Sequence, residues 1–204
     1  MRLAMILKLV LVSAMIVAIL GCASSKPKVS RVETNTVTDL SGRWNDTDSR
    51  MTAEAMIQDL LSRPWLNEYG MMTGKKPIVI VGEVRNKSSE HINTDVFTKD
   101  IERELINSGK VTFVATSDER QQLREERLDQ QSFASRETMK KWADETGADH
   151  MLLGSINSVV DAVEGERAVF YQVNLELINI EKNTKVWIGE KKIKKVIEQD
   201  KYKW

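Results

Sequence analysis

Few side chains in the sequence have the types and spacing that catalysis requires. The two histidines, His91 and His150, have no cysteine or suitably spaced partner, and a metal site needs several converging ligands. The phosphate loop G-x-x-x-x-G-K-[ST], the dinucleotide fingerprint G-x-G-x-x-G and the acyl-transfer motif G-x-S-x-G are all missing. The acidic pair Asp118-Glu119 lies in a charged helical pattern, and carboxylates used in catalysis need burial to separate their pKa values. We therefore expect no enzyme, cofactor, metal or small-molecule substrate.

One reactive group has a distinctive setting: the thiol of Cys22, the only cysteine in the chain. The chain starts with Arg2 and Lys8, and the run Leu9–Leu20 is apolar but too short to span a bilayer. This pattern is typical of a secretory signal. A lone cysteine in an exported protein cannot form an intrachain disulfide, so three roles remain: an intermolecular disulfide, a free thiol or a membrane anchor formed by modification of the thiol.

The position of Cys22 favours the anchor. Gly21 followed by Cys22, directly behind the apolar run, resembles the lipobox of bacterial lipoproteins. The resemblance implies that residues 1–21 are a signal peptide cut between Gly21 and Cys22, and that the thiol and the new amine receive acyl chains such as palmitate. In enteric-type lipoproteins an Asp after the cysteine favours the inner membrane. Ala23 therefore indicates the outer membrane, with the protein facing the periplasm.

The rest of the chain divides into a tether and one domain. Residues 22–40 are polar, contain a single proline and show no helical or strand period, so we predict a lipidated flexible tether. Residues 41–204 contain the periodic apolar segments and predict a single globular domain. The chain has 30 basic and 30 acidic residues, and this balance gives no field that would favour nucleic acid.

Apolar periodicity predicts an α/β domain (α+β-like) in which a mixed sheet of four to five strands is packed by about four helices. The first helix should be capped by Asp46, Thr47 or Asp48 and end before Pro64. The further expected helices are 65–72, 95–107, 118–131 (capped by Ser117) and 137–148, and the expected strands are 77–84, 111–115, 150–159, 168–180 and 185–193, the last two paired as a hairpin.

Three stretches present candidate partner-binding residues. In SGRWNDTDSR, Arg43 and Trp44 are not needed for capping or bending, and Trp44 is either a lid on the sheet, which we favour, or an exposed anchor. Arg85 and Asn86 begin a loop at the carboxyl end of a strand, where ligands often bind, although capping and solvation explain this loop equally well.

The third stretch is the charged helix 118–131, which includes Arg120 and Arg124. It contains only two apolar residues, so it must project into solvent or contact a partner, and a solvated helix is the simpler interpretation. The lysines near the carboxyl terminus could contact an anionic surface, but such residues more often keep an edge strand unpaired.

Several segments together resemble the LpoB-type family of outer-membrane lipoproteins that activate class A penicillin-binding proteins. The resemblance covers the chain from Ser41 to about Lys195 and is carried by these segments: ILGC, SGRWNDTDSR, IVIVGEVRNKSSEHIN, IERELINSGKVTFVA, GADHMLLGSINS and FYQVNLELINIEKNTKVWIG. It implies a domain related to the amino-terminal domain of TolB. It also implies a lipid-tethered regulator without chemistry of its own, whose docking on a peptidoglycan synthase stimulates glycan polymerisation and crosslinking.

One departure from the family concerns the tether, which is shorter here and contains only Pro27. An alternative function is that of an envelope structural or secretion-associated lipoprotein with a related α/β domain, as in curli-pore lipoproteins. An envelope hydrolase is a further alternative, without support from any motif.

Overall fold

The computed structural model describes residues 29–133 and 147–198. It divides into two units, Met1–Thr36 and Val37–Trp204. The described residues of the first unit are exposed, and one turn is closed by the Thr36 N–H donating to the Glu33 carbonyl at 3.0 Å. All helices and strands named below belong to the second unit. The helix predicted over 137–148 falls largely outside the described residues.

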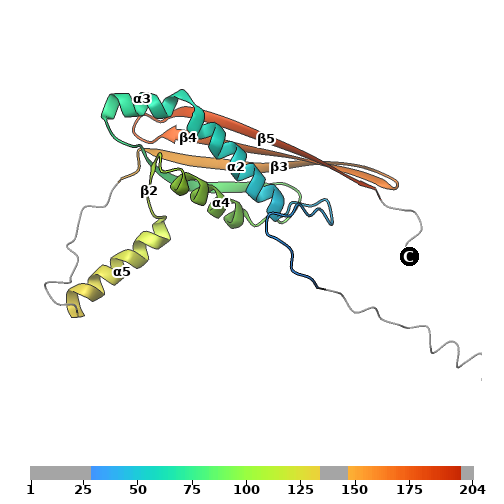
Figure 1. Ribbon diagram of the computed structural model, residues 1–204, viewed down its shortest axis with the longest axis horizontal. Coiled ribbons are helices and arrows are strands. Elements are labelled where there is room, and N and C mark those ends of the chain that lie inside the picture. Colours follow the sequence, from blue (N-terminus) through green and yellow to red (C-terminus); the bar gives the residue numbers. More distant parts are fainter. Residues whose placement is uncertain (1–28, 134–146, 199–204) are drawn as a thin grey trace, which may run out of the picture. The chain divides into compact units, whose positions relative to one another are not determined.

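A five-stranded mixed sheet, in the order β2-β1-β3-β4-β5, forms the frame of the second unit (Figure 1). Its strands are β1 Ile78–Lys87, β2 Thr112–Phe113, β3 His150–Val163, β4 Glu166–Asn179 and β5 Thr184–Glu198. β1 pairs in parallel with β2 and β3, whereas β3, β4 and β5 form an antiparallel meander. The predicted mixed α/β fold is therefore confirmed; the likeness to the TolB amino-terminal domain remains a prediction.

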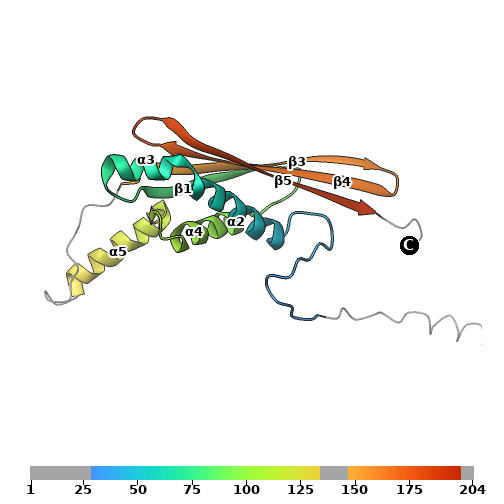
Figure 2. The same cartoon turned by 45° about the horizontal axis from the view of Figure 1, so that its top comes forward.

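The helices cover one face of this sheet. The described helices are α2 Asp46–Ser62, α3 Pro64–Thr73, α4 Thr94–Asn107 and α5 Ser117–Phe133. Figure 2 shows α2, α3 and α4 on the same side of the sheet, so the opposite face carries no described helix. α2 contacts both α4 and β5, and α4 contacts β1. One sheet face is thus left open for the described part of the chain.

The core lies between the covered face and α2 and α4. Every second residue of β4 is buried: Val169, Tyr171, Val173, Leu175 and Leu177. Facing them are the apolar stripes of the two helices, which are buried at Ala53, Met56, Ile57, Leu60 and Leu61 of α2 and at Phe97, Ile101 and Leu105 of α4. The apolar period also predicted that Val96 of α4 is buried, but Val96 is 49% exposed. This alternation holds because successive strand residues point to opposite faces of a sheet.

The ends of several elements differ from the sequence predictions. Asn45, not one of the next three residues, caps α2: its side chain accepts from the Asp48 N–H, and the Asp48 carboxylate accepts from the Asn45 N–H. The residue before α5, Thr116, forms the same reciprocal pair with Glu119, so the predicted cap at Ser117 was wrong by one residue. In both cases the reciprocal bond of a side chain at the third helical position selects the cap.

Candidate partner-binding site

Trp44 lies against the core rather than projecting as an anchor. Its ring meets Phe97 edge-on with centroids 6.1 Å apart, and Tyr171 at 5.6 Å. Its backbone N–H donates to Glu90 Oε2 at 3.2 Å, while the Tyr171 hydroxyl donates to Glu90 Oε1 at 2.7 Å. Burial, together with the Glu90 carboxylate, raises the pKa of Tyr171 above its ordinary range. The lid interpretation of Trp44 therefore agrees with the structure.

A buried lysine fixes the chain next to this lid. Lys195 Nζ lies 2.5 Å from Asp39 Oδ1, 2.6 Å from Asp48 Oδ2 and 3.1 Å from the Arg43 carbonyl oxygen. The Lys195 and Asp48 side chains are only 9% and 7% exposed, whereas Asp39 is 46% exposed. We call these four residues the Lys195 cluster. The hydrogen bond from Lys195 lowers the pKa of Asp39, and burial raises the pKa of Asp48.

The Lys195 cluster and the lid together attach the segment Ser41–Arg50 to the sheet. Gly42 enables the bend at this point: its φ is +67°, and a Cβ there would lie 2.3 Å from Ile197 Cγ1. Arg43 contributes its backbone carbonyl, and its side chain is exposed. The dense polar run is therefore mainly a structural junction, and only the Arg43 guanidinium remains as a docking candidate within it.

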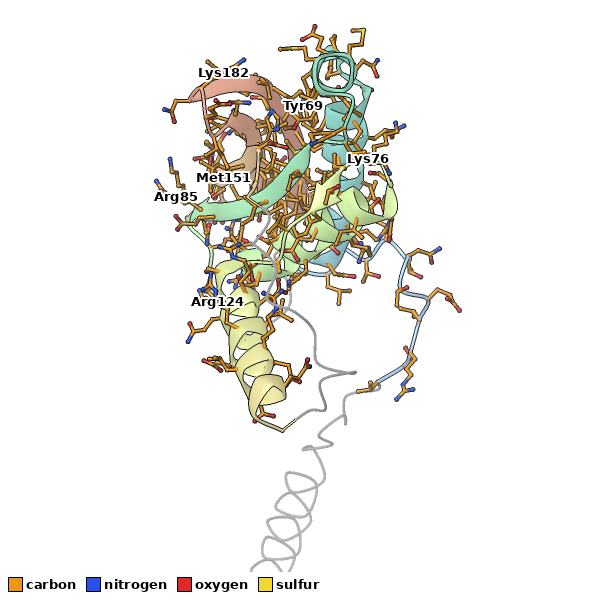
Figure 3. The ribbon with its side chains drawn as sticks, turned by 90° about the vertical axis from the view of Figure 1, so that its left-hand side faces the viewer. Tyr69, Lys76, Arg85, Arg124, Met151 and Lys182 are labelled. Atoms are coloured by element: carbon orange, nitrogen blue, oxygen red, sulfur yellow. The ribbon has the colours of Figure 1, made fainter. Side chains whose placement is uncertain are left out.

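β1 continues to Lys87, so Arg85 and Asn86 lie at the end of this strand and pair with β3; the prediction that a loop begins at Arg85 was wrong by three residues. The two candidate residues have different roles. Asn86 shapes the loop, because its Nδ2 donates to the Glu90 carbonyl at 2.8 Å and its Oδ1 accepts from the Ser88 N–H at 3.0 Å. Arg85 is exposed and pairs with Glu83 at 2.9 Å (Figure 3). It lines a hollow of about 250 Å³ with Asn174 and other residues of the open sheet face.

Polar side chains continue across this open face. Gln172 Nε2 donates to Glu190 Oε2 at 2.6 Å, and Lys192 pairs with Glu190 at 2.6 Å. Further along the two strands, Lys185 of β5 pairs with Glu176 of β4 at 2.7 Å. The described part of this face thus carries hydrogen-bonded polar side chains, with exposed apolar residues such as Ile188 among them, and this surface can bind a partner.

The third candidate surface is α5. Arg120 Nη1 donates to the Ala115 carbonyl at 2.7 Å, and Glu119 pairs with Lys99 of α4 at 3.2 Å. Leu123 and Leu128 are 47% and 54% exposed. The structure thus places the six predicted docking residues at the junction, at the end of β1 and on α5, and it does not bring them together in one site.

A cavity that the sequence did not predict lies between α3 and the β4–β5 turn. Its volume is about 870 Å³, and Trp65, Tyr69 and His150 line it. The His150 ring is 5.3 Å from Trp65 and 5.5 Å from Tyr69, measured between centroids, and the residue is only 2% exposed. Nδ1 of His150 has no hydrogen-bond partner among the described residues. The signal for this site in the sequence was limited to the aromatic side chains of α3.

Burial of His150 makes the stability of the domain depend on pH. Desolvation lowers the pKa of His150, against the opposing effect of the Asp149 charge, so the unfolded chain binds this proton more readily than the folded one. The free energy of unfolding has its full value at pH values above the pKa of His150 in the unfolded chain, which is about 6.5. Below that pH the free energy of unfolding decreases, by at most about 1.4 kcal/mol per pH unit for this one proton. Urea unfolding between pH 7.5 and 5.5 measures this slope.

A matched pair of variants isolates the histidine. His150→Gln should reduce the slope, whereas His91→Gln, at an exposed loop position, should leave it unchanged. An unchanged slope in the His150→Gln variant would show that other groups control the pH dependence.

Metal chemistry and membrane spans find no support in residues 29–133 and 147–198. Within these ranges no group of three His, Cys, Asp or Glu side chains is arranged to hold a metal ion. Likewise, no helix in this part of the chain has the length and apolar character needed to cross a membrane. Gly21 and Cys22 lie outside the described residues.

A family model described as "Peptidoglycan-synthase activator LpoB" matches residues 48–193. Among solved structures, the LpoB C-terminal domain from Salmonella enterica is 18% identical, with 69% of this chain and 97% of that chain covered and a TM-score of 0.38. The Escherichia coli LpoB C-terminal domain is 16% identical, with 69% of this chain and 97% of that chain covered and a TM-score of 0.38. Lipoprotein GNA1162 from Neisseria meningitidis is 9% identical, with 62% of this chain and 88% of that chain covered and a TM-score of 0.39. No curated protein matches the chain.

Proposed function

The chain belongs to the LpoB family of peptidoglycan-synthase activators, and from this premise we propose that it is a lipid-anchored periplasmic regulator that binds and activates a class A penicillin-binding protein. The match over residues 48–193 carries the proposal, since it begins in α2, includes β1 to β4 and ends within β5. In this proposal the protein binds the synthase and performs no reaction itself. The synthase supplies the chemistry of glycan polymerisation and peptide crosslinking.

The open sheet face supports a binding role. Its polar side chains are held by hydrogen bonds and ion pairs, such as those of Glu190 with Gln172 and Lys192, before any partner arrives. A surface whose side chains are already ordered loses less conformational entropy on binding. Arg85 at the edge of this face adds a planar guanidinium that can bind a carboxylate or a backbone carbonyl.

The proposal places the anchor at Cys22 in the outer membrane. Lipidation of Cys22 attaches residues 22–40 to the membrane, and the Lys195 cluster receives the tether at Asp39 on the edge of the domain. Because Lys195 and Trp44 fix the junction, tension on the tether is transmitted to the body of the domain rather than to a loose terminus. The anchored domain then faces the periplasm, where the synthase domains of a penicillin-binding protein lie.

The test uses residues 23–204 without lipid, added to a class A penicillin-binding protein from the same organism. Glycan-strand formation from lipid II is followed with time. We expect the initial rate to rise and to saturate with added protein, whereas a monofunctional glycosyltransferase, used as a control, should show no rise. An unchanged rate with a folded domain and an active synthase would contradict the proposed function.

A further inference from the structure

The helix α3 is apolar, yet the core uses little of it. Its sequence is PWLNEYGMMT, and Trp65 is the one residue of this helix that is buried. Met71 and Met72 are 80% and 76% exposed. An apolar helix of a globular domain normally turns a broad apolar stripe to the core. α3 therefore keeps apolar contact surface that the described core does not use.

One side of α3 forms a wall of the cavity between this helix and the β4–β5 turn. Trp65, Tyr69 and Met72 follow the spacing i, i+4, i+7, which places them on one side of the helix, and all three line the cavity. Figure 3 labels Tyr69 on α3 and Lys182 on the turn, at the two sides of the cavity. Its volume of about 870 Å³ lies within the range of small-molecule sites, so it has room for a ligand with several functional groups.

Hydrogen bonds hold the aromatic wall in place. The Tyr69 hydroxyl donates to Asp149 Oδ2 at 2.6 Å, and the Ile78 N–H donates to the same oxygen at 2.8 Å. The bond to Asp149, followed by burial, raises the pKa of Tyr69, so the hydroxyl keeps its proton. Trp65 Nε1 donates to the Leu60 carbonyl at 2.7 Å. Because the rings are already fixed, a ligand that contacts them loses little free energy in ordering them.

The charged groups around the cavity are mainly acidic. Glu68 of α3, Asp149 before β3 and Glu181 of the β4–β5 turn line it, and Lys182 is the one basic residue that does so in the described chain. Glu68 and Glu181 are exposed, and their carboxylates have no hydrogen-bond or ion-pair partner among the described residues. Burial lowers the pKa of His150, so its ring adds no positive charge at pH 7. The lining therefore carries an excess of negative charge.

An aromatic wall and carboxylates around one cavity favour a cation. The face of a tyrosine ring attracts an ammonium or guanidinium group, and carboxylates accept the N–H donors of such a group. We propose that the cavity between α3 and the β4–β5 turn binds an organic cation that is attached to an apolar body, such as a peptide with an arginine or lysine side chain. The apolar body contacts Met72 and Ile180, which are 76% and 41% exposed.

The chemistry of the lining disfavours other ligands. An anionic ligand meets the negative charge of Glu68, Asp149 and Glu181. A metal ion needs several converging ligands, and no such group of His, Cys, Asp or Glu side chains occurs within 29–133 and 147–198. The inference goes beyond the proposed function and does not depend on it, because a soluble peptide and a basic side chain of the synthase present the same cation.

Two matched peptide probes test the charge of the ligand. The first is N-acetyl-phenylalanyl-arginine amide. In the second, citrulline replaces arginine, which keeps the shape of the side chain and removes its positive charge. Each probe is titrated into isotopically labelled protein, residues 23–204, and the backbone amide signals of α3 and the β4–β5 turn are followed by NMR. We expect the arginine probe to shift these signals and to bind about tenfold more tightly than the citrulline probe, with an affinity that falls as salt is added.

A matched pair of variants tests the location. Glu68→Gln with Glu181→Gln removes two exposed carboxylates that line the cavity. Glu166→Gln with Glu198→Gln removes two exposed carboxylates that face each other at the opposite end of the β4–β5 pair. Circular dichroism checks that both variants keep the fold. We expect the first variant to bind the arginine probe about three- to tenfold more weakly, as exposed ion pairs predict, and the second to bind it as the unchanged protein does.

Equal binding of the two probes would overturn the inference, and so would equal weakening by the two variants, since the charge effect would then not belong to the cavity. Signals that shift elsewhere in the domain, with those of α3 and the turn unchanged, would overturn it as well. Competition then identifies the source of the cation. If the saturating arginine probe displaces the synthase, a basic side chain of the synthase occupies the cavity. If synthase binding is unaffected while the probe binds, the ligand is a soluble peptide.

Discussion

Lys195→Ala is expected to lower the free energy of unfolding by about 3 kcal/mol, the largest loss that we expect from a single surface-strand substitution. The lysine is the one cation bonded to Asp48 within the described part of the chain, and both side chains are nearly inaccessible to water. Removing it leaves the Asp48 carboxylate buried without a counter-charge, although Asp48 still accepts from the Asn45 N–H. The Arg43 carbonyl and Asp39 lose the same donor.

Urea unfolding at pH 7 measures this loss, and Lys194→Ala is the matched control, since Lys194 precedes Lys195 on β5 and is exposed. A second signature is the pH dependence. Burial already raises the pKa of Asp48, and without Lys195 the folded protein should bind a proton at Asp48 more readily than the unfolded chain does. The difference between variant and unchanged protein should therefore shrink as pH falls from 7 to 4. Equal stability of the two alanine variants would contradict this role of the cluster.

Segments with a strong apolar period were predictable from the sequence. α2 and α4 bury the stripes that the i, i+3, i+4 spacing indicates, and β4 alternates as its pattern requires. The helix starts were harder, because several residues in a row can cap. Only the two reciprocal hydrogen bonds between Asn45 and Asp48 distinguish the N-cap from the neighbouring residues. These bonds depend on backbone geometry that the amino-acid sequence alone does not specify.

The strands extend further than predicted. β3 and β4 continue to a tight turn at Gly165, whose φ is +84°, and β5 continues to Glu198. The sequence predicts that the strand ends at Ile193, because the residues after it show no clear apolar period. Lys195 lies between Ile193 and Ile197 on the face of β5 that the helices cover. A lysine at such a position is tolerated only where hydrogen-bond acceptors lie within reach of its ammonium group. Those acceptors come from residues about 150 positions earlier, which no local pattern reveals.

The sequence identified residues of a kind that binds partners, but it did not predict where these residues lie relative to one another in the fold. Trp44 lies in the segment before α2 and Asn86 at the end of β1, and the sequence alone does not distinguish an exposed anchor from a side chain that fixes the neighbouring backbone. The two arginines of α5 were found because the helix has few apolar residues.

Cys22→Ser is expected to move essentially all of the protein from the membrane fraction to the aqueous fraction of the cell. A serine hydroxyl does not accept the thioether-linked diacylglyceryl group, and each buried methylene of an acyl chain contributes about 0.8 kcal/mol to membrane binding, so the loss of the chains removes the whole anchor. Labelling with an alkyne analogue of palmitate measures the acylation, and cell fractionation then measures the share of the protein in the membrane fraction. Ser24→Ala, two residues away, should keep both label and membrane location.

This substitution also separates anchorage from activation. The binding surfaces that we propose lie on the domain, so the Cys22→Ser protein should stimulate the purified synthase as well as the unchanged chain does. In cells the same variant should fail to support wall synthesis and should sensitise them to β-lactams, because an untethered domain is not held at the membrane that faces the synthase. A variant that stays in the membrane fraction would show that another segment provides the anchor. A variant that functions normally in cells after release would show that activation needs only the domain and no tether.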